Sequence, residues 1–86
     1  MNLSLGDISG SVLVISQFTL CADTRKGRRP SFVNAESPEL SKKLYNKFIS
    51  CLEDKGLEVQ SGEFGSNMDV KLVNNGPVTF VLDSED

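Results

Sequence analysis

The sequence contains no histidine, so a zinc site would lack one of its usual ligands and a hydroxyl nucleophile would lack a common base. Protein zinc sites are built mainly from cysteine and histidine, and the two cysteines, Cys21 and Cys51, lie too far apart in sequence to form a CxxC pair. We therefore expect no metal site and no cofactor. In a reducing compartment, two such thiols are expected to be buried or without a role.

Long apolar runs are also missing. No run approaches the roughly 20 residues that a membrane-spanning helix needs, and the opening stretch MNLSLGDISG lacks the basic region and apolar core of a signal peptide. We therefore expect a cytoplasmic protein without a membrane partner. With 86 residues, a single domain over residues 1–86 is the default expectation.

Positive charge is scarce overall but concentrated in one place. The net charge of −3 argues against a general affinity for nucleic acid, and we expect no binding to DNA. Four of the nine basic residues nevertheless lie in the stretch Arg25-Lys26-Gly27-Arg28-Arg29. Salt screening confines each charge to about 8–10 Å, so a local patch can bind phosphate on an acidic protein. Charge alone favours the simpler interpretation, a solvated loop.

One segment has the start, periodicity and end of an amphipathic helix. Ser37-Pro38-Glu39 offers a capping hydroxyl, a proline at the first helical position and an acid in the first turn. Apolar residues follow at spacings of four: Leu40, Leu44, Phe48 and Leu52. The pair Lys55-Gly56 is typical of a helix end. This pattern predicts one main helix at about 37–55 that packs against a sheet or a partner.

Alternating apolar residues predict strands over most of the remaining chain. The predicted strands are 11–21, 57–60, 68–72 and 78–82, with 2–5 as an edge strand. Residues 22–36 are expected to form a long loop, and loops of this length are often functional. The order of elements predicts an α+β domain with a mostly antiparallel sheet.

Polar residues interrupt the first long strand near its end. Ser16, Gln17 and Thr19 follow an apolar run, and polar side chains late in a buried strand need partners. They are either satisfied structural groups or part of a site at the strand end. Threonine is a common strand former, so strand propensity alone explains both Thr19 and Thr79.

A turn near the carboxyl end carries a proline where a strand should begin. Asn74-Asn75-Gly76 supplies the positive-φ positions of a tight turn. Pro77 is tolerated at the first position of the next strand, because its missing N–H can face away from the ladder. A Gly-Pro bond can be cis, although trans is expected from frequency alone.

Four blocks of sequence together resemble the D-aminoacyl-tRNA deacylase family. The blocks are SQFTL at 16–20, ADTRKGRRPSF at 22–32, GEFG at 62–65 with Met68, and NNGPVT at 74–79. They occur in the family's order and run along nearly the whole chain. Family members are nearly twice as long, so the chain resembles their second half. The resemblance implies the family's fold, a partly barrel-like sheet, with the N-terminal half absent.

The resemblance implies an enzyme of translation quality control that acts as a chiral proofreader. Family members hydrolyse the ester that joins a D-amino acid, or glycine, to tRNA. They are homodimers with an active site at each end of the subunit interface. Their Gly-Pro pair, Gly76-Pro77 here, is cis and enters the partner's pocket, where it excludes an L side chain by steric clash.

Two chemical accounts suit the residues of this resemblance. In one, the hydroxyl of Thr19 or Thr79 is the nucleophile, but a hydroxyl needs a base and the chain has no histidine. In the other, N–H groups around Ser16, Gln17 and Phe18 stabilise the oxyanion. The ribose hydroxyl of the substrate, or a water, then attacks, while Phe18 shapes the pocket or stacks on the adenine. We favour the second account.

The resemblance also gives the basic stretch a role. Arg25, Lys26, Arg28 and Arg29 are expected to contact phosphates near the tRNA acceptor end, where such contacts position the RNA without reading its sequence. Two other hypotheses stay open. One is a catalytically inactive fragment of the fold that binds RNA or a protein, and the other is a half-domain whose unpaired strand edges associate.

Overall fold

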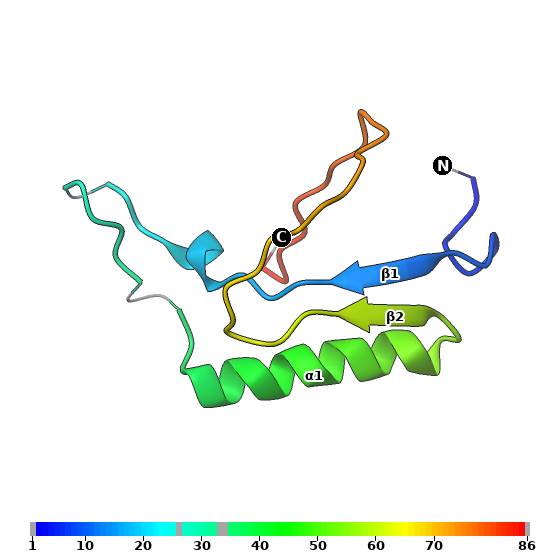
Figure 1. The fold of residues 1–86 in the computed structure, drawn as a ribbon, viewed down its shortest axis with the longest axis horizontal. Coiled ribbons are helices and arrows are strands. Elements are labelled where there is room, and N and C mark those ends of the chain that lie inside the picture. Colours follow the sequence, from blue (N-terminus) through cyan, green and yellow to red (C-terminus); the bar gives the residue numbers. More distant parts are fainter. Residues whose placement is uncertain (1, 26, 33–34, 86) are drawn as a thin grey trace.

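A computed structural model of the chain describes residues 2–25, 27–32 and 35–85. The elements in these ranges are strand β1 (Ser11–Val14), 3-10 helix η1 (Phe18–Cys21), helix α1 (Pro38–Asp54) and strand β2 (Glu58–Ser61). Figure 1 shows α1 running along β2, with β1 on the far side of β2. The broad α+β class predicted from the sequence is therefore confirmed.

Helix α1 is the predicted helix, and its ends match the local signals. The Ser37 side-chain oxygen accepts a hydrogen bond from the Leu40 N–H at 3.4 Å, and Pro38 occupies the first turn. After Asp54 the chain leaves the helix through Gly56, whose φ of 82° belongs to the left-handed region that glycine adopts easily. Local sequence therefore determines where this helix begins and ends.

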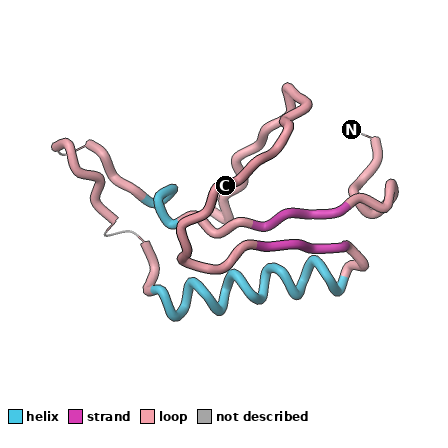
Figure 2. The backbone as a smooth tube through the Cα atoms, viewed as in Figure 1, coloured by secondary structure: helices cyan, strands magenta, loops and turns pink. Residues whose placement is uncertain are grey.

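The sheet has two parallel strands, which corrects the predicted antiparallel arrangement. β1 and β2 pair from Ser11 opposite Glu58 to Val14 opposite Ser61. Helix α1 lies between them in the sequence and returns the chain to the same end of the sheet, as a parallel pair requires. In the described ranges, antiparallel pairing is limited to the single bridge between Asp23 and Ser31. No partial barrel is formed there (Figure 2).

The predicted strands are shorter or missing. The strand predicted at 11–21 ends at Val14, and its last four residues form η1 instead. The strand predicted at 57–60 is confirmed as β2. The segments 2–5, 68–72 and 78–82 form no strand, and in Figure 1 the chain beyond residue 70 extends away from the sheet and doubles back. An apolar alternation becomes a strand only where a second strand pairs with it.

Tyr45 holds the small core together. Its hydroxyl donates a hydrogen bond to the Val14 carbonyl oxygen at 2.7 Å, and its ring lies 5.6 Å from the Phe64 ring. Val14 is the one buried apolar residue in the described part of the chain. A single side chain of α1 thus connects the helix, β1 and the turn after β2.

The molecule is open for its mass. Its accessible surface is 8127 Å², whereas a folded monomer of this mass is expected to expose about 5,000 Å². Its radius of gyration is 15.3 Å, against an expected value of about 12 Å. Large apolar side chains on several segments remain exposed, including Leu44 and Phe48 of α1.

The sequence predicts two thiols that are buried or without a role, and the structure contradicts the first of these alternatives. Cys21 and Cys51 are both free and exposed, because η1 and the outer face of α1 carry them at the surface. No group of three or more potential metal-binding side chains comes together in the described residues. Neither of the helices described is both long and apolar enough to cross a membrane.

Candidate functional site

The end of β1 turns sharply into η1 at the SQFT block. Gln17 is the cap of η1, with extended backbone angles of φ −152° and ψ 93°. Its side-chain oxygen accepts hydrogen bonds from the Thr19 hydroxyl at 2.5 Å and from the Thr19 N–H at 3.4 Å. Glutamine therefore satisfies one of the N–H groups that the start of a helix leaves without a partner.

This contact orients the Thr19 hydroxyl without activating it. A nucleophilic hydroxyl must lose its proton to a base, but the atom that receives the hydrogen bond is the amide oxygen of Gln17. A neutral amide oxygen accepts a hydrogen bond and does not take up the proton at ordinary pH. The arrangement therefore places Thr19 as a fixed polar group.

Two aromatic rings connect the strand end to the long loop. Phe18 follows Gln17 and is 61% exposed. Its ring centroid lies 5.0 Å from that of Phe32, with the ring planes inclined at 57°. This is a favourable tilted arrangement for an aromatic pair. Phe32 thereby holds the returning end of the loop against η1.

A pair of main-chain hydrogen bonds closes the basic loop. The Asp23 N–H donates to the Ser31 carbonyl at 2.6 Å, and the Ser31 N–H donates to the Asp23 carbonyl at 2.8 Å. Residues 24–25 and 27–30 lie in the loop between these two partners, and Gly27 adopts a φ of 85° there. Lys26, one of the predicted tRNA-binding residues, lies outside the described residues.

Arg25 binds the carboxylate at the base of this loop. Its Nε lies 3.1 Å from Asp23 Oδ1 and its Nη2 lies 2.9 Å from Asp23 Oδ2. The Arg25 side chain, followed by the Arg25 N–H, lowers the pKa of Asp23 from its ordinary value. In return, the hydrogen bond to Asp23 raises the pKa of Arg25. The carboxylate is therefore charged and paired at neutral pH.

Sequence reasoning missed Asp23, and a local signal for it exists. Aspartate followed two residues later by a backbone N–H donor is a common turn arrangement, and Asp23 Oδ1 accepts from the Arg25 N–H at 3.0 Å. Arg28 and Arg29 are exposed. Within the described ranges the Arg25–Asp23 contact is the one ion pair present.

The Gly-Pro turn stands apart from the strand end in this chain. The Gly76–Pro77 peptide is cis, as the resemblance implied, and Gly76, Pro77 and Thr79 are all exposed. A Cβ at Gly76 would lie only 3.0 Å from the Val78 nitrogen, so a side chain there would require the turn to shift slightly. In Figure 1 the turn is at the tip of the orange segment, away from η1.

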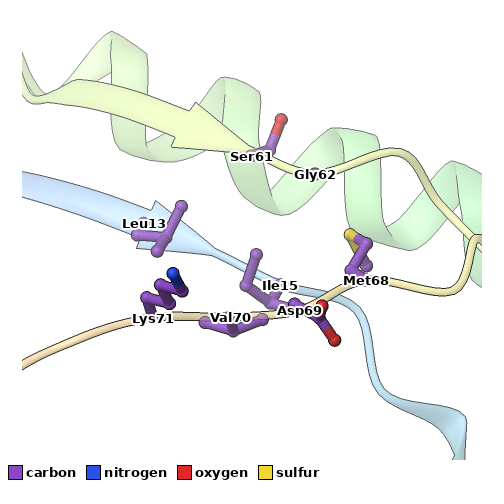
Figure 3. A pocket seen from close by; sticks show the side chains of 8 residues that line it. All are labelled: Leu13, Ile15, Ser61, Gly62, Met68, Asp69, Val70 and Lys71. Atoms are coloured by element: carbon purple, nitrogen blue, oxygen red, sulfur yellow. The ribbon is translucent and has the colours of Figure 1, made fainter.

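A shallow hollow of about 290 Å³ lies between the sheet and the segment after β2 (Figure 3). Leu13 and Ile15 face Met68 and Val70 across it. The Met68 sulfur occupies the space that a side chain at Gly62 would need. Ser61, Asp69 and Lys71 complete its lining, so the hollow is only partly apolar, and no residue predicted as part of the site lines it.

The structure therefore groups part of the predicted site. Gln17, Phe18 and Thr19 lie together at the start of η1, with Ser16 half-buried just before them. The Phe18–Phe32 contact places the basic loop beside them. In Figure 1 the segment that carries the Gly-Pro turn extends away from this group.

A family model and several known proteins each match nearly the whole length of this chain. A family model described as "D-Tyr-tRNA(Tyr) deacylase" matches residues 1–83. The D-aminoacyl-tRNA deacylases of Clostridium beijerinckii and Thermosipho africanus are 58% and 54% identical over 85 residues, which is 99% of this chain and 57% of each relative. A Bacillus subtilis protein called "Inactive D-aminoacyl-tRNA deacylase" is 53% identical over 85 residues, or 64% of its length. The chain thus spans 57–64% of the length of these relatives.

Proposed function

Because the chain belongs to the D-Tyr-tRNA(Tyr) deacylase family, we propose that it hydrolyses the ester bond of D-aminoacyl-tRNA and of mischarged glycyl-tRNA. The products are the free amino acid and tRNA, and the role is chiral proofreading in translation. The observation that carries this proposal is the match of residues 1–83 to the family model. A cytoplasmic location follows from the role, because translation takes place there.

The strand end supports a mechanism in which the protein positions the ester and the substrate supplies the nucleophile. The Thr19 hydroxyl already donates to Gln17 and has no basic partner in that contact, which disfavours Thr19 as the attacking group. N–H groups around Ser16, Gln17 and Phe18 stabilise the oxyanion, which is worth about 2.7–4 kcal/mol for each well-placed donor. The neighbouring ribose hydroxyl, or a water, attacks the ester carbonyl.

The Gly76-Pro77 turn of a second subunit selects the chirality of the substrate. In this proposal the chain is a homodimer, and Gly76-Pro77 of one copy enters the site of the other and excludes an L side chain. The exposure of this turn, and its distance from η1 in one chain, fit a group that acts on a partner. Thr79 follows the turn and is proposed to line the same pocket.

A second candidate is a catalytically inactive fragment that binds RNA or a protein. Two observations favour it: the chain spans 57% of a relative named D-aminoacyl-tRNA deacylase, and a relative of similar identity carries the name "Inactive D-aminoacyl-tRNA deacylase". Overall identity therefore does not separate the two candidates, and a direct assay is required.

The deciding assay measures the loss of esterified amino acid from D-tyrosyl-tRNA, L-tyrosyl-tRNA and glycyl-tRNA. The enzyme proposal predicts accelerated loss from the D-tyrosyl and glycyl substrates and only buffer-rate loss from the L-tyrosyl substrate. Retained tRNA binding with no acceleration for any substrate would favour the inactive fragment. The Asp54→Asn variant, altered at the far end of α1, serves as a control that should match the wild type.

A further inference from the structure

The basic loop contains an internal ion pair that divides its arginines into two kinds. Arg25 directs two of its nitrogens at Asp23, whereas Arg28 and Arg29 are exposed and form no ion pair with any described residue. A guanidinium that grips one carboxylate with its fork has fewer donors for a second anion in the same geometry. The sequence alone does not distinguish these arginines, whereas in the structure only Arg25 is paired with a carboxylate of a described residue.

The ion pair belongs to a set of contacts that all act at the base of the loop. The two main-chain bonds between Asp23 and Ser31 close it, the Arg25 N–H donates to the same Asp23 carboxylate, and Phe32 contacts Phe18 at the strand end. In Figure 1 this loop extends from η1 as the cyan-to-green excursion. Its two remaining arginines are therefore presented from a fixed base beside the candidate catalytic residues.

We propose that Asp23 and Arg25 form a clamp that holds Arg28 and Arg29 in position for phosphates of the tRNA acceptor end. Arg25 is then a positioning residue and not a phosphate ligand. This inference rests on the proposed function, because it assumes that the loop meets RNA. Holding a loop in its bound geometry raises affinity by lowering the ordering cost of binding.

The Asp23→Asn variant gives a test in which two accounts predict opposite signs. The substitution makes the protein more positive by one charge and releases Arg25. If the loop acts only through its total charge, binding to tRNA without an attached amino acid becomes tighter. If the clamp positions the loop, binding becomes weaker by about twofold to tenfold, the range expected for losing the order of one long side chain. Asp54→Asn makes the same charge change on α1 and is the matched control.

A double-mutant cycle and the salt dependence identify the role of Arg25. We expect Arg25→Gln to weaken binding as Asp23→Asn does, and the double variant to be no worse than either, because both remove one interaction. Arg28→Ala and Arg29→Ala should each make the negative slope of log affinity against log salt shallower by about 0.7–0.9. Arg25→Gln should leave that slope unchanged. Equal slope losses for Arg25 and Arg28, or independent costs in the cycle, would overturn the proposal.

Limited trypsin digestion tests the clamp in the absence of RNA. We expect the bond after Arg28 to be cut faster in Asp23→Asn than in the wild type and in Asp54→Asn, while circular dichroism shows the same helix content in all three. Equal cutting rates would overturn the clamp itself. A wild type with a clamped loop that does not bind tRNA would contradict the proposed function, and with it the phosphate role of Arg28 and Arg29.

Discussion

The environment of Asp23 differs from what the sequence suggests. Its pKa lies below the ordinary value of 3.8, first because of the Arg25 side chain and then because of the Arg25 N–H. A group whose pKa is lowered on folding stabilises the fold above its ordinary pKa. That contribution is lost as the pH falls through the lowered pKa. The clamp is therefore complete at neutral pH and opens only in acid.

This leads to a titration experiment on single carboxylates. In carbon NMR, the Asp23 carboxyl of the wild type should titrate below 3.8, and Arg25→Gln should move its midpoint up toward that value. Asp7 is an internal control, because hydrogen bonds with the Ser4 main chain and side chain lower its pKa and do not involve Arg25. An Asp23 midpoint that is the same in both proteins would contradict the ion pair.

Thr19 provides the residue-level test of the chemistry. Its hydroxyl donates to Gln17 Oε1, so we expect Thr19→Val to lower the single-turnover rate on D-tyrosyl-tRNA by about tenfold at most. Removal of an obligatory nucleophile costs far more, on the order of 10⁴-fold to 10⁶-fold. A loss of that size in Thr19→Val, with unchanged tRNA binding, would reinstate threonine as the nucleophile.

At the level of elements, α1 and strand β2 could be predicted, but the pairing within the sheet could not. The helix depends on local features: the Ser37 cap, Pro38 in the first turn and Gly56 after its end. A strand depends on a second segment far away in sequence, so the alternation at 68–72 and 78–82 predicted strands that the described chain does not pair. The parallel direction of β1 and β2 follows from the path through α1, which local patterns do not contain.

The candidate site shows the same division between local and non-local information. The SQFT residues could be identified from sequence, but not the turn that converts them from strand into η1, because Gln17 caps Thr19 only in that geometry. The basic stretch was identified as a group, whereas the role of Asp23 depends on the bridge to Ser31. Contacts that bring distant residues together were the part that pattern reasoning could not supply.

The Ser37 cap makes a quantitative prediction about α1. Ser37→Ala removes the side-chain acceptor for the Leu40 N–H, and we expect it to lower the free energy of unfolding by about 1 kcal/mol, within the usual range of about 0.5–2 kcal/mol for a lost cap. Urea unfolding followed by circular dichroism measures this. Ser50→Ala, on an exposed position within α1, is the matched control and should cause no loss. Equal stability of the two variants would show that the cap does not contribute.

At the level of the whole molecule, the exposed surface is the dominant feature. The chain exposes 8127 Å², roughly 3,000 Å² more than a monomer of its mass should. A typical specific interface buries only about 800 Å² on each partner. Some of the surplus is strongly apolar, since Val73, Val81 and Leu82 are each at least 90% exposed. A surface of this kind marks a site of association.

We therefore predict that the 86-residue chain does not remain a monomer at micromolar concentration. Size-exclusion chromatography with light scattering should give a mass at least twice 9.4 kDa, because association covers apolar area that water otherwise contacts. Dilution should increase the binding of a hydrophobic dye as the assembly separates. A 9.4 kDa species with native-like spectra and little dye binding would contradict this prediction.

The most direct test of the account is the ratio of D-tyrosyl to L-tyrosyl cleavage rates before and after substitution of Pro77. In the proposed mechanism, the bulk of the Gly76-Pro77 corner excludes the L side chain, and the strand end cleaves the ester. Pro77→Ala should therefore raise L-tyrosyl-tRNA cleavage at least about tenfold, the effect of relieving a modest clash, while D-tyrosyl-tRNA cleavage changes little. A variant that still spares the L substrate, or that loses both activities together, would contradict the account.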